Sequence, residues 1–425
     1  MIFKNLFSKS QFIKNVVTLI TGATLAQVIP FAIAPILTRL YDPSDFAIFA
    51  IYTSIATFVS IGAAGRFELS IVDQRNEKDA NNILLLCLSM VSIISVVLLL
   101  ITVVFNSNIT ILIERPGISN WLYLLPLTIL MIGYHNCLNF WLNRESKFEI
   151  MSKGKVVQSS INGVTSIGIG LFSLNGLIIG PIIGAMSSIL YIIKKLVPRK
   201  FEWDLNRSNY KRYIRKNKQF VIYNLPNTLI DGVRLMAINI LIGKYFGIFI
   251  LGYFSFAWRI VHAPVAIIAG SVGQVFFKKL TELKNKKNEH LSKIVIQFLI
   301  RQSSLGIIPF ILLYFFSEDI FQIVFGPEWK EAGMYASILS PWLFFNFISS
   351  PLSFIFIVFE KQLTMLIISV LYTVVPMTIL LNNNNDDFLT VLYMISYSMS
   401  FLLITMIIIA LFITFKFENS RSEET

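Results

Sequence analysis

Long apolar runs, repeated along the whole chain, constrain this fold more than any other feature. A helix that crosses about 30 Å of hydrocarbon needs about 20 apolar residues. Backbone amides find no partner in lipid, so such runs span as helices, and the alternating pattern of a membrane barrel is absent. The sequence predicts twelve spans, near residues 16–37, 46–64, 83–105, 121–142, 156–174, 176–193, 220–242, 246–276, 294–316, 334–358, 363–381 and 388–415.

The composition agrees that part of the protein's solvent is lipid. Only 14% of the 425 residues are charged and 55% are hydrophobic, whereas soluble domains carry about 25% charged residues. This excludes a soluble enzyme, a disordered chain and a disulfide scaffold. Cys87 and Cys137 lie inside apolar runs without metal-ligand spacing. No phosphate-binding loop occurs, so neither a cofactor nor a built-in ATPase is expected.

The basic residues give the orientation. Most of the 36 Lys and Arg fall in alternate loops, and the other set of loops holds only Arg39, Arg115, Lys244 and Lys330. Because cytoplasmic loops are the basic ones, both termini are predicted to be cytoplasmic. The net charge of +12 is therefore an orientation signal, and nucleic acid is not an expected partner.

The most basic inner loop, residues 194–219, lies at mid-chain. It predicts an N-terminal six-helix lobe at 1–193, a basic cytoplasmic linker at 194–219, a C-terminal six-helix lobe at 220–415 and a cytoplasmic tail at 416–425. Weak similarity between the halves favours a repeat axis along the membrane normal. The linker is either a solvated loop or a helix on the anionic inner leaflet.

Three arginines inside predicted second-half spans suggest an anionic cargo. A charge at the bilayer centre costs about 2.5–3.5 kcal/mol, so Arg234, Arg259 and Arg301 should face a cavity or a partner. The guanidinium fork suits phosphate because it donates two hydrogen bonds at once. Asp231 can pair with Arg234 three residues later, and as a buried pair the two could serve packing alone.

The first half offers polar rather than cationic candidates. His135 and Asn139 share one helix face at i, i+4, and Gln27 lies near Pro30 in the first span. These side chains either line a sugar-accepting cavity or hydrogen-bond between helices. Two interface pairs are predicted, Arg66 with Glu68 at the inner end of the second span and Arg144 with Glu145 at the inner end of the fourth.

Titratable residues in the predicted spans bear on which ion drives transport. Asp231 and His262 are the titratable groups of the second half that could carry a proton. The first span shows no acidic cluster for sodium. An ion gradient, with protons favoured over sodium, is therefore the expected energy source.

Three blocks resemble a known family. TGATLAQVIPFAIAPILTRLYDPSDFAIFAIY (21–52), WRIVHAPVAIIAGSVGQVFFKKLTE (258–282) and FGPEWKEAGMYASILSPWLFFNFISSPLSFIFIVFEKQ (325–362) are similar to the Wzx-type polysaccharide repeat-unit flippases. These belong to the polysaccharide transport family of the multidrug/oligosaccharidyl-lipid/polysaccharide exporter superfamily. The family's R-x-x-x-x-P block falls on Arg259 and Pro264.

The resemblance implies an all-α, MATE-like integral membrane protein with two six-helix lobes around a V-shaped central cavity. It implies translocation of undecaprenyl-diphosphate-linked oligosaccharide across the bacterial cytoplasmic (inner) membrane. It also implies delivery to O-antigen (lipopolysaccharide) or capsule synthesis, with a polysaccharide polymerase and a chain-length regulator as partners. Three rivals stay open, one of which, a lipid II flippase, would be expected to carry two further spans. A drug or metabolite antiporter would favour acids in the cavity, and a multi-span polymerase would favour a large outer loop.

Overall fold

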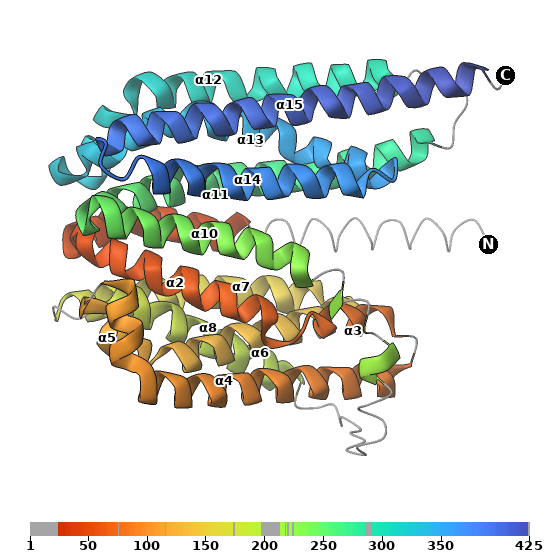
Figure 1. The fold of residues 1–425 in the computed structure, drawn as a ribbon. Helices are drawn as coiled ribbons and strands as arrows, with labels where there is room; N and C mark the ends of the chain where they lie inside the picture. Colours follow the sequence, from red (N-terminus) through yellow and green to blue (C-terminus); the bar gives the residue numbers. More distant parts are fainter. Residues whose placement is uncertain are drawn as a thin grey trace. The chain divides into compact units, whose positions relative to one another are not determined.

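The computed structural model describes residues 24–74, 76–114, 116–172, 175–196, 213–216, 218, 221–222, 225–284 and 291–423. Within these ranges every regular element is a helix (Figure 1). Contacts divide the chain into two compact units, Met1–Ile240 and Leu241–Thr425. Most of α10 (Leu225–Phe246), which the sequence assigns to the C-terminal lobe, groups with the first unit.

Eight helices of the described chain are long and apolar enough to cross a membrane. They are α2 (Pro43–Ala63), α4 (Glu77–Ile113), α8 (Gly176–Leu196), α11 (Ile248–Lys284), α12 (Leu291–Phe325), α13 (Lys330–Val358), α14 (Gln362–Asn382) and α15 (Phe388–Glu423). The chain is therefore a multi-pass membrane protein, as its hydropathy predicts.

The remaining predicted spans fall on less apolar or shorter helices. These are Thr24–Leu40, α6 (Leu125–Arg144), α7 (Phe148–Gly170) and α10. The total of twelve spans accordingly stays a prediction. Short helical turns connect some of the long helices: η1 (Phe67–Leu69), α3 (Ser70–Asp73), η2 (Pro116–Ile118), α5 (Ser119–Leu122) and η4 (Pro327–Trp329).

A capping box starts α2. The Asp42 carboxylate accepts from the backbone amides of Ser44 (2.8 Å) and Asp45 (3.1 Å), and Asp45 accepts from the Asp42 amide (3.3 Å). Pro43 occupies the first turn, where its missing N–H costs nothing. The chain therefore turns sharply between the helix Thr24–Leu40 and α2.

A buried tyrosine ties this turn to the α7–α8 hairpin. The Tyr41 hydroxyl donates to the Ser166 carbonyl (2.6 Å) on α7 and accepts from the Gly176 amide (3.0 Å) at the start of α8. The Ser166 hydroxyl in turn donates to the Gly176 carbonyl (3.0 Å). The two Tyr41 bonds join segments more than 120 residues apart, and one of them satisfies the first amide of α8.

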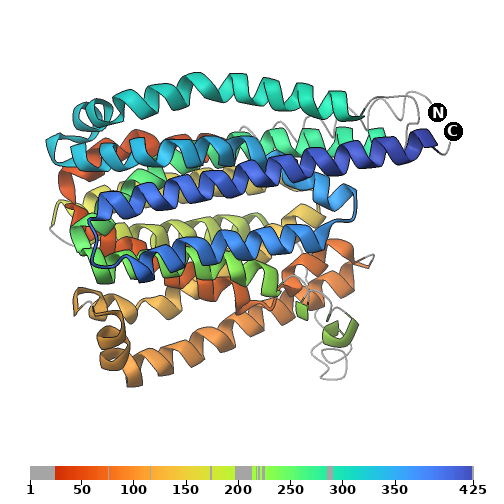
Figure 2. The same cartoon turned by 45° about the horizontal axis from the view of Figure 1, so that its top comes forward.

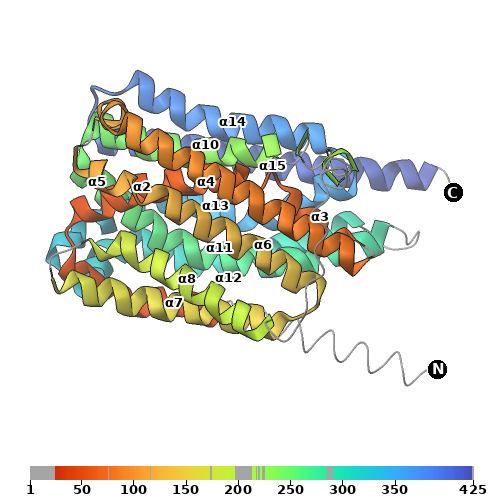
Figure 3. The ribbon, with the colours of Figure 1, turned by 90° about the horizontal axis from the view of Figure 1, so that it is seen from below.

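Small residues let α7 and α8 approach closely, and the two helices lie side by side (Figure 3). Among the described helices no other pair makes a more extensive contact. Gly176, Gly180, Gly184 and Ser188 recur every four residues on α8. A Cβ at Gly180 would lie 2.1 Å from Ser166 Oγ, and one at Gly184 would lie 2.6 Å from the Gln158 carbonyl. The predicted hairpin is confirmed, although two turn residues, 173–174, lie outside the described chain.

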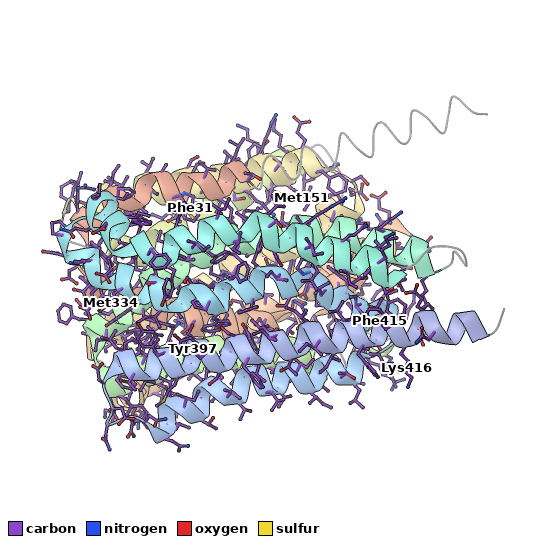
Figure 4. All side chains as sticks on the ribbon, turned by 90° about the horizontal axis from the view of Figure 1, so that it is seen from above. Phe31, Met151, Met334, Tyr397, Phe415 and Lys416 are labelled. Carbon is purple, nitrogen blue, oxygen red and sulfur yellow. The ribbon has the colours of Figure 1, made fainter. Side chains whose placement is uncertain are left out.

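In the second unit, α13 packs against α11, α12 and α15, whose long helices run side by side (Figure 2). Side-chain hydroxyls join them: Ser396 donates to the Ile338 carbonyl (2.6 Å) and Ser317 to the Gly333 carbonyl (2.7 Å). Figure 4 marks Phe415 and Lys416 toward the C-terminal end of α15. Fully buried Trp329 packs on Phe256 at 4.4 Å between ring centroids.

Most of the predicted basic linker lies outside the described residues. Of its second part, 213–216 and 218 are described. Tyr213 is buried; its hydroxyl donates to Asp79 (2.8 Å) and accepts from Asn82 (3.2 Å), and Lys216 Nζ donates to Gln74 Oε1 (3.3 Å). This part of the linker is therefore fixed to the start of α4 in the first unit.

The close α7–α8 packing predicts unequal effects of two glycine substitutions. Gly184→Ala puts a methyl group against the Gln158 backbone and should cost about 1–3 kcal/mol. It should lower the melting temperature of the purified protein in detergent. Gly168→Ala on α7 is the matched control, because its Cβ would meet nothing within 4 Å. Equal melting temperatures for the two variants would contradict the packing argument.

Candidate functional site

The structure places the predicted arginines on three helices. Arg259 on α11 and Arg301 on α12 belong to the second unit, and both are exposed. Arg234 on α10 belongs to the first unit and is half-buried. The first unit therefore contains one of the three predicted arginines, and the second unit contains the other two.

The predicted Asp231–Arg234 pair forms. Arg234 Nη2 lies 3.5 Å from Asp231 Oδ1, and the Asp231 side chain is 61% exposed against 15% for Arg234. An ion pair with one exposed partner contributes little stability. The pair leaves the Asp231 charge exposed while the guanidinium is mostly covered.

His262 sits in a row of aromatic rings in the second unit. Its ring stacks on Trp258 one turn earlier, with centroids 5.0 Å apart and planes 12° apart. Trp258 packs on Trp342 at 4.7 Å. Trp342 Nε1 donates to the Tyr372 hydroxyl, which also accepts from Asn346 Nδ2 (3.3 Å). The stacking on Trp258 therefore fixes the orientation of the His262 ring, which is half-buried. Its proton-carrying role stays a prediction.

His135 and Asn139 come together on α6 as their spacing predicts. Asn139 Nδ2 donates to the His135 carbonyl (2.9 Å). His135 is only 9% exposed. Among the described residues, neither His135 Nδ1 nor the buried Asn139 Oδ1 has a hydrogen-bond partner. Buried polar atoms in a bilayer are costly when unpaired, so this face of α6 has unused capacity to bind. Gln27 lies on the helix Thr24–Leu40, where it is exposed.

Sequence reasoning missed Lys155. The predicted fifth span began at residue 156, which placed this lysine in a loop. The structure begins α7 at Phe148, so Lys155 lies about two turns inside the helix. It is half-buried, and its ammonium acts electrostatically on His135. The helical i, i+4 ion pair of Glu149 and Lys153 (2.7 Å) is the sequence signal that could have moved the helix start.

The predicted Arg66–Glu68 pair forms, and its carboxyl is unexpectedly buried. Arg66 Nη1 lies 3.4 Å from Glu68 Oε1, but Glu68 is 5% exposed and its Oε2 has no partner in the described chain. Cys87 on α4 is an electrostatic neighbour. Burial raises the pKa of the Glu68 carboxyl, and Arg66 offsets only part of that rise. Glu68 can therefore bind a proton at the cytoplasmic end of α2.

The second predicted interface pair forms closely. Arg144 Nη1 lies 2.6 Å from Glu145 Oε1, and Arg144 Nε donates to the Gln74 carbonyl (3.3 Å). Across the described ranges no group of three or more His, Cys, Asp or Glu side chains could hold a metal ion. The arginines and Lys155 suit binding of anionic groups, His135 suits binding of hydroxylated groups, and Glu68 suits binding of a proton.

Similar solved structures have the fold of transporters. The lipid II flippase MurJ in an inward closed conformation aligns over 95% of this chain and 90% of its own, with a TM-score of 0.71 and 13% identity. An inward-facing multidrug resistance MATE transporter of the MOP superfamily aligns over 96% and 95%, with a TM-score of 0.64 and 15% identity. The chain therefore has the two-lobe MATE-like fold that its sequence predicts.

Curated relatives come from polysaccharide gene regions or pathways. A Klebsiella pneumoniae protein named as an uncharacterized membrane protein in the cps region is 20% identical over 297 residues, covering 69% of this chain. The succinoglycan biosynthesis transport protein ExoT of Rhizobium meliloti (strain 1021) is 21% identical over 310 residues, covering 71%. The matches span 60% of the length of each relative. A family model described as polysaccharide biosynthesis protein matches residues 36–334, and the chain belongs to that family.

Proposed function

We propose that this protein is a flippase that moves undecaprenyl-diphosphate-linked oligosaccharide from the cytoplasmic to the periplasmic leaflet of a bacterial inner membrane. The observation that carries the proposal is the placement of Arg234, Arg259 and Arg301 on predicted spans of a polysaccharide biosynthesis family member. The predicted second-half spans carry three arginines and one aspartate in the sequence. This excess of positive charge favours an anionic headgroup, and diphosphate suits the paired donors of a guanidinium.

The relatives support this cargo class. ExoT is named as a transport protein of succinoglycan biosynthesis, and MurJ as a flippase of lipid II. We infer that the present chain serves O-antigen or capsule synthesis. A polysaccharide polymerase and a chain-length regulator would then act on its product.

The proposed mechanism is alternating access. The arginines attract the diphosphate while His135, Asn139 and Gln27 accept the sugars, and the lipid tail stays in the bilayer. The two lobes then rock and open the site outward. Release requires that no single contact be very strong, so the binding free energy is shared among several moderate contacts.

A drug or metabolite antiporter is the second candidate, because multidrug transporters share the fold. A cationic drug would require acids where this chain places arginines. The arginine variants below separate the candidates, because loss of an arginine should impair export of an anionic lipid-linked sugar and should not impair export of a cation.

Removing the arginines should reduce polysaccharide export. Arg259→Ala and Arg234→Ala should each lower surface polysaccharide at least about tenfold, equivalent to about 1.4 kcal/mol, with protein level held constant. The measurement is surface polysaccharide per molecule of membrane-inserted protein. Arg39→Ala is the control, because Arg39 is exposed and its guanidinium binds the nearby Pro35 carbonyl. Wild-type output from both test variants would remove the arginines from the site.

Protons are the proposed coupling ion, with no cofactor. Asp231 and His262 are candidates from the sequence. Glu68 joins them because it is a buried carboxyl with an unpaired oxygen, facing Arg66 and Cys87. A carrier of this kind binds a proton on one side of the membrane and releases it when its surroundings change.

The raised pKa of Glu68 predicts a pH-dependent difference in stability. The folded protein holds the Glu68 proton above the ordinary glutamate pKa of about 4.3, so folding binds protons there. Wild-type protein should lose stability as pH rises through the pKa of folded Glu68, whereas Glu68→Gln stays neutral. The melting temperature of Glu68→Gln minus that of wild type should therefore increase between about pH 5 and pH 8. Glu77→Gln, at an exposed carboxyl, should track wild type. A difference that is flat with pH would contradict the burial argument.

A further inference from the structure

Three unsatisfied polar atoms lie on α6 and α8 of the first unit, two helices that contact each other and that both pack against α7. They are His135 Nδ1, Asn139 Oδ1 and Ser188 Oγ, each buried and each without a hydrogen-bond partner in the described chain. Ser188 is fully buried at 0% exposure. We call these three residues, with Lys155, the α6–α8 polar junction. Its members come from all three helices, and α6 contacts both α7 and α8.

His135 interacts with both Asn139 and Lys155, and Ser188 lies against the residue before Lys155. Asn139 and His135 are hydrogen-bonded along α6. Lys155 acts electrostatically on His135 from α7. Gly154, the residue before Lys155, faces α8 so closely that a Cβ there would lie 3.1 Å from Ser188 Oγ. Met151, labelled in Figure 4, lies on α7 one turn before Lys155.

The junction lies at one depth. His135, Lys155 and Ser188 are each roughly two turns, about 10–14 Å at 1.5 Å per residue, from the cytoplasmic ends of α6, α7 and α8. A polar atom left unpaired in the membrane interior costs several kcal/mol. Lys155 and Asn139 remain half-buried rather than fully enclosed, so the junction has an accessible edge.

The donors and acceptors of the junction define what it can bind. Lys155 donates, Asn139 Oδ1 accepts, and the Ser188 hydroxyl and the His135 ring can take part in hydrogen bonds of either sense. A simple anion would satisfy Lys155 but not the Asn139 carbonyl. A metal cation would satisfy that carbonyl but be repelled by Lys155. Neighbouring hydroxyls on a sugar ring satisfy all of these groups, because each hydroxyl both donates and accepts.

We propose that the α6–α8 polar junction is a subsite that hydrogen-bonds the hydroxyls of one sugar ring of the lipid-linked oligosaccharide. The proposal rests on the proposed function and adds Lys155 and Ser188 to the sugar-binding residues. Different residues then bind the two parts of the cargo: the arginines bind the diphosphate, and the junction binds the sugar.

The test compares a glycosylated lipid with its sugar-free counterpart. The full-length protein in nanodiscs is titrated with lipid-linked repeat unit extracted from a deletion strain of the producing bacterium, and separately with undecaprenyl diphosphate. Lys155→Met should raise Kd for the glycosylated lipid at least tenfold and change Kd for undecaprenyl diphosphate less than twofold. Lys153→Met is the matched control: it lies on the same helix, but its ammonium is exposed and paired with Glu149 at 2.7 Å. It should bind both lipids like wild type.

Milder variants keep the test decisive if Lys155→Met folds poorly. Lys155→Gln and Ser188→Ala change few atoms, and each should weaken only the glycosylated lipid. Equal weakening of both lipids would assign Lys155 to the diphosphate or to folding and overturn the subsite. Unchanged binding of both would mean that the junction holds water only, which also overturns it. If wild-type protein binds neither lipid, the proposed function itself fails, and the subsite fails with it.

Discussion

The absence of hydrogen-bonding partners in hydrocarbon is the constraint on which the rest of this structure depends. It forces the chain into helices, and it removes the hydrophobic drive that would pack helices together in water. Close approach of helix backbones and buried side-chain hydrogen bonds hold the helices together instead. The glycines of α8 let its backbone lie against α7, and Tyr41 bonds both helices at once. In the second unit, Ser396 performs the same task by binding a carbonyl of α13.

The same constraint makes the exceptions informative. A buried polar atom without a partner is rare in proteins and more costly in a bilayer, so each one points to water, a proton or a ligand. The orphan oxygen of Glu68 lies at the cytoplasmic end of α2, whereas the orphans of the α6–α8 polar junction lie inside the helix bundle. Their different settings favour different roles, proton binding for Glu68 and hydrogen bonding to cargo for the junction.

Much of the fold was predictable because it depends on local properties. The length of each apolar run predicts a membrane span. The three-residue spacing of Asp231 and Arg234 predicts their ion pair, which the structure contains. The predicted fifth span excludes Lys155 because a span assigned by hydropathy ends where a charged residue occurs. The helix itself continues past such a residue, and α7 begins at Phe148. The burial of Glu68 could not be foreseen, since it depends on α4 folding against η1 and placing Cys87 beside the carboxyl. The aromatic row of His262 likewise depends on α13 and α14. Contacts between distant segments have no signature in a single sequence.

The Asp231–Arg234 pair shows how binding and release can coexist in the proposed flippase. A guanidinium without a partner inside a membrane would be costly, yet one locked in a short, buried bridge could not exchange partners. The observed separation of 3.5 Å, with Asp231 mostly exposed, lies between these extremes. In the proposed mechanism a diphosphate, which offers more acceptor oxygens than a carboxylate, would displace Asp231, and Asp231 would pair with Arg234 again once the lipid leaves. In that exchange the acid lowers the cost of the empty site and also keeps the occupied site from being too stable.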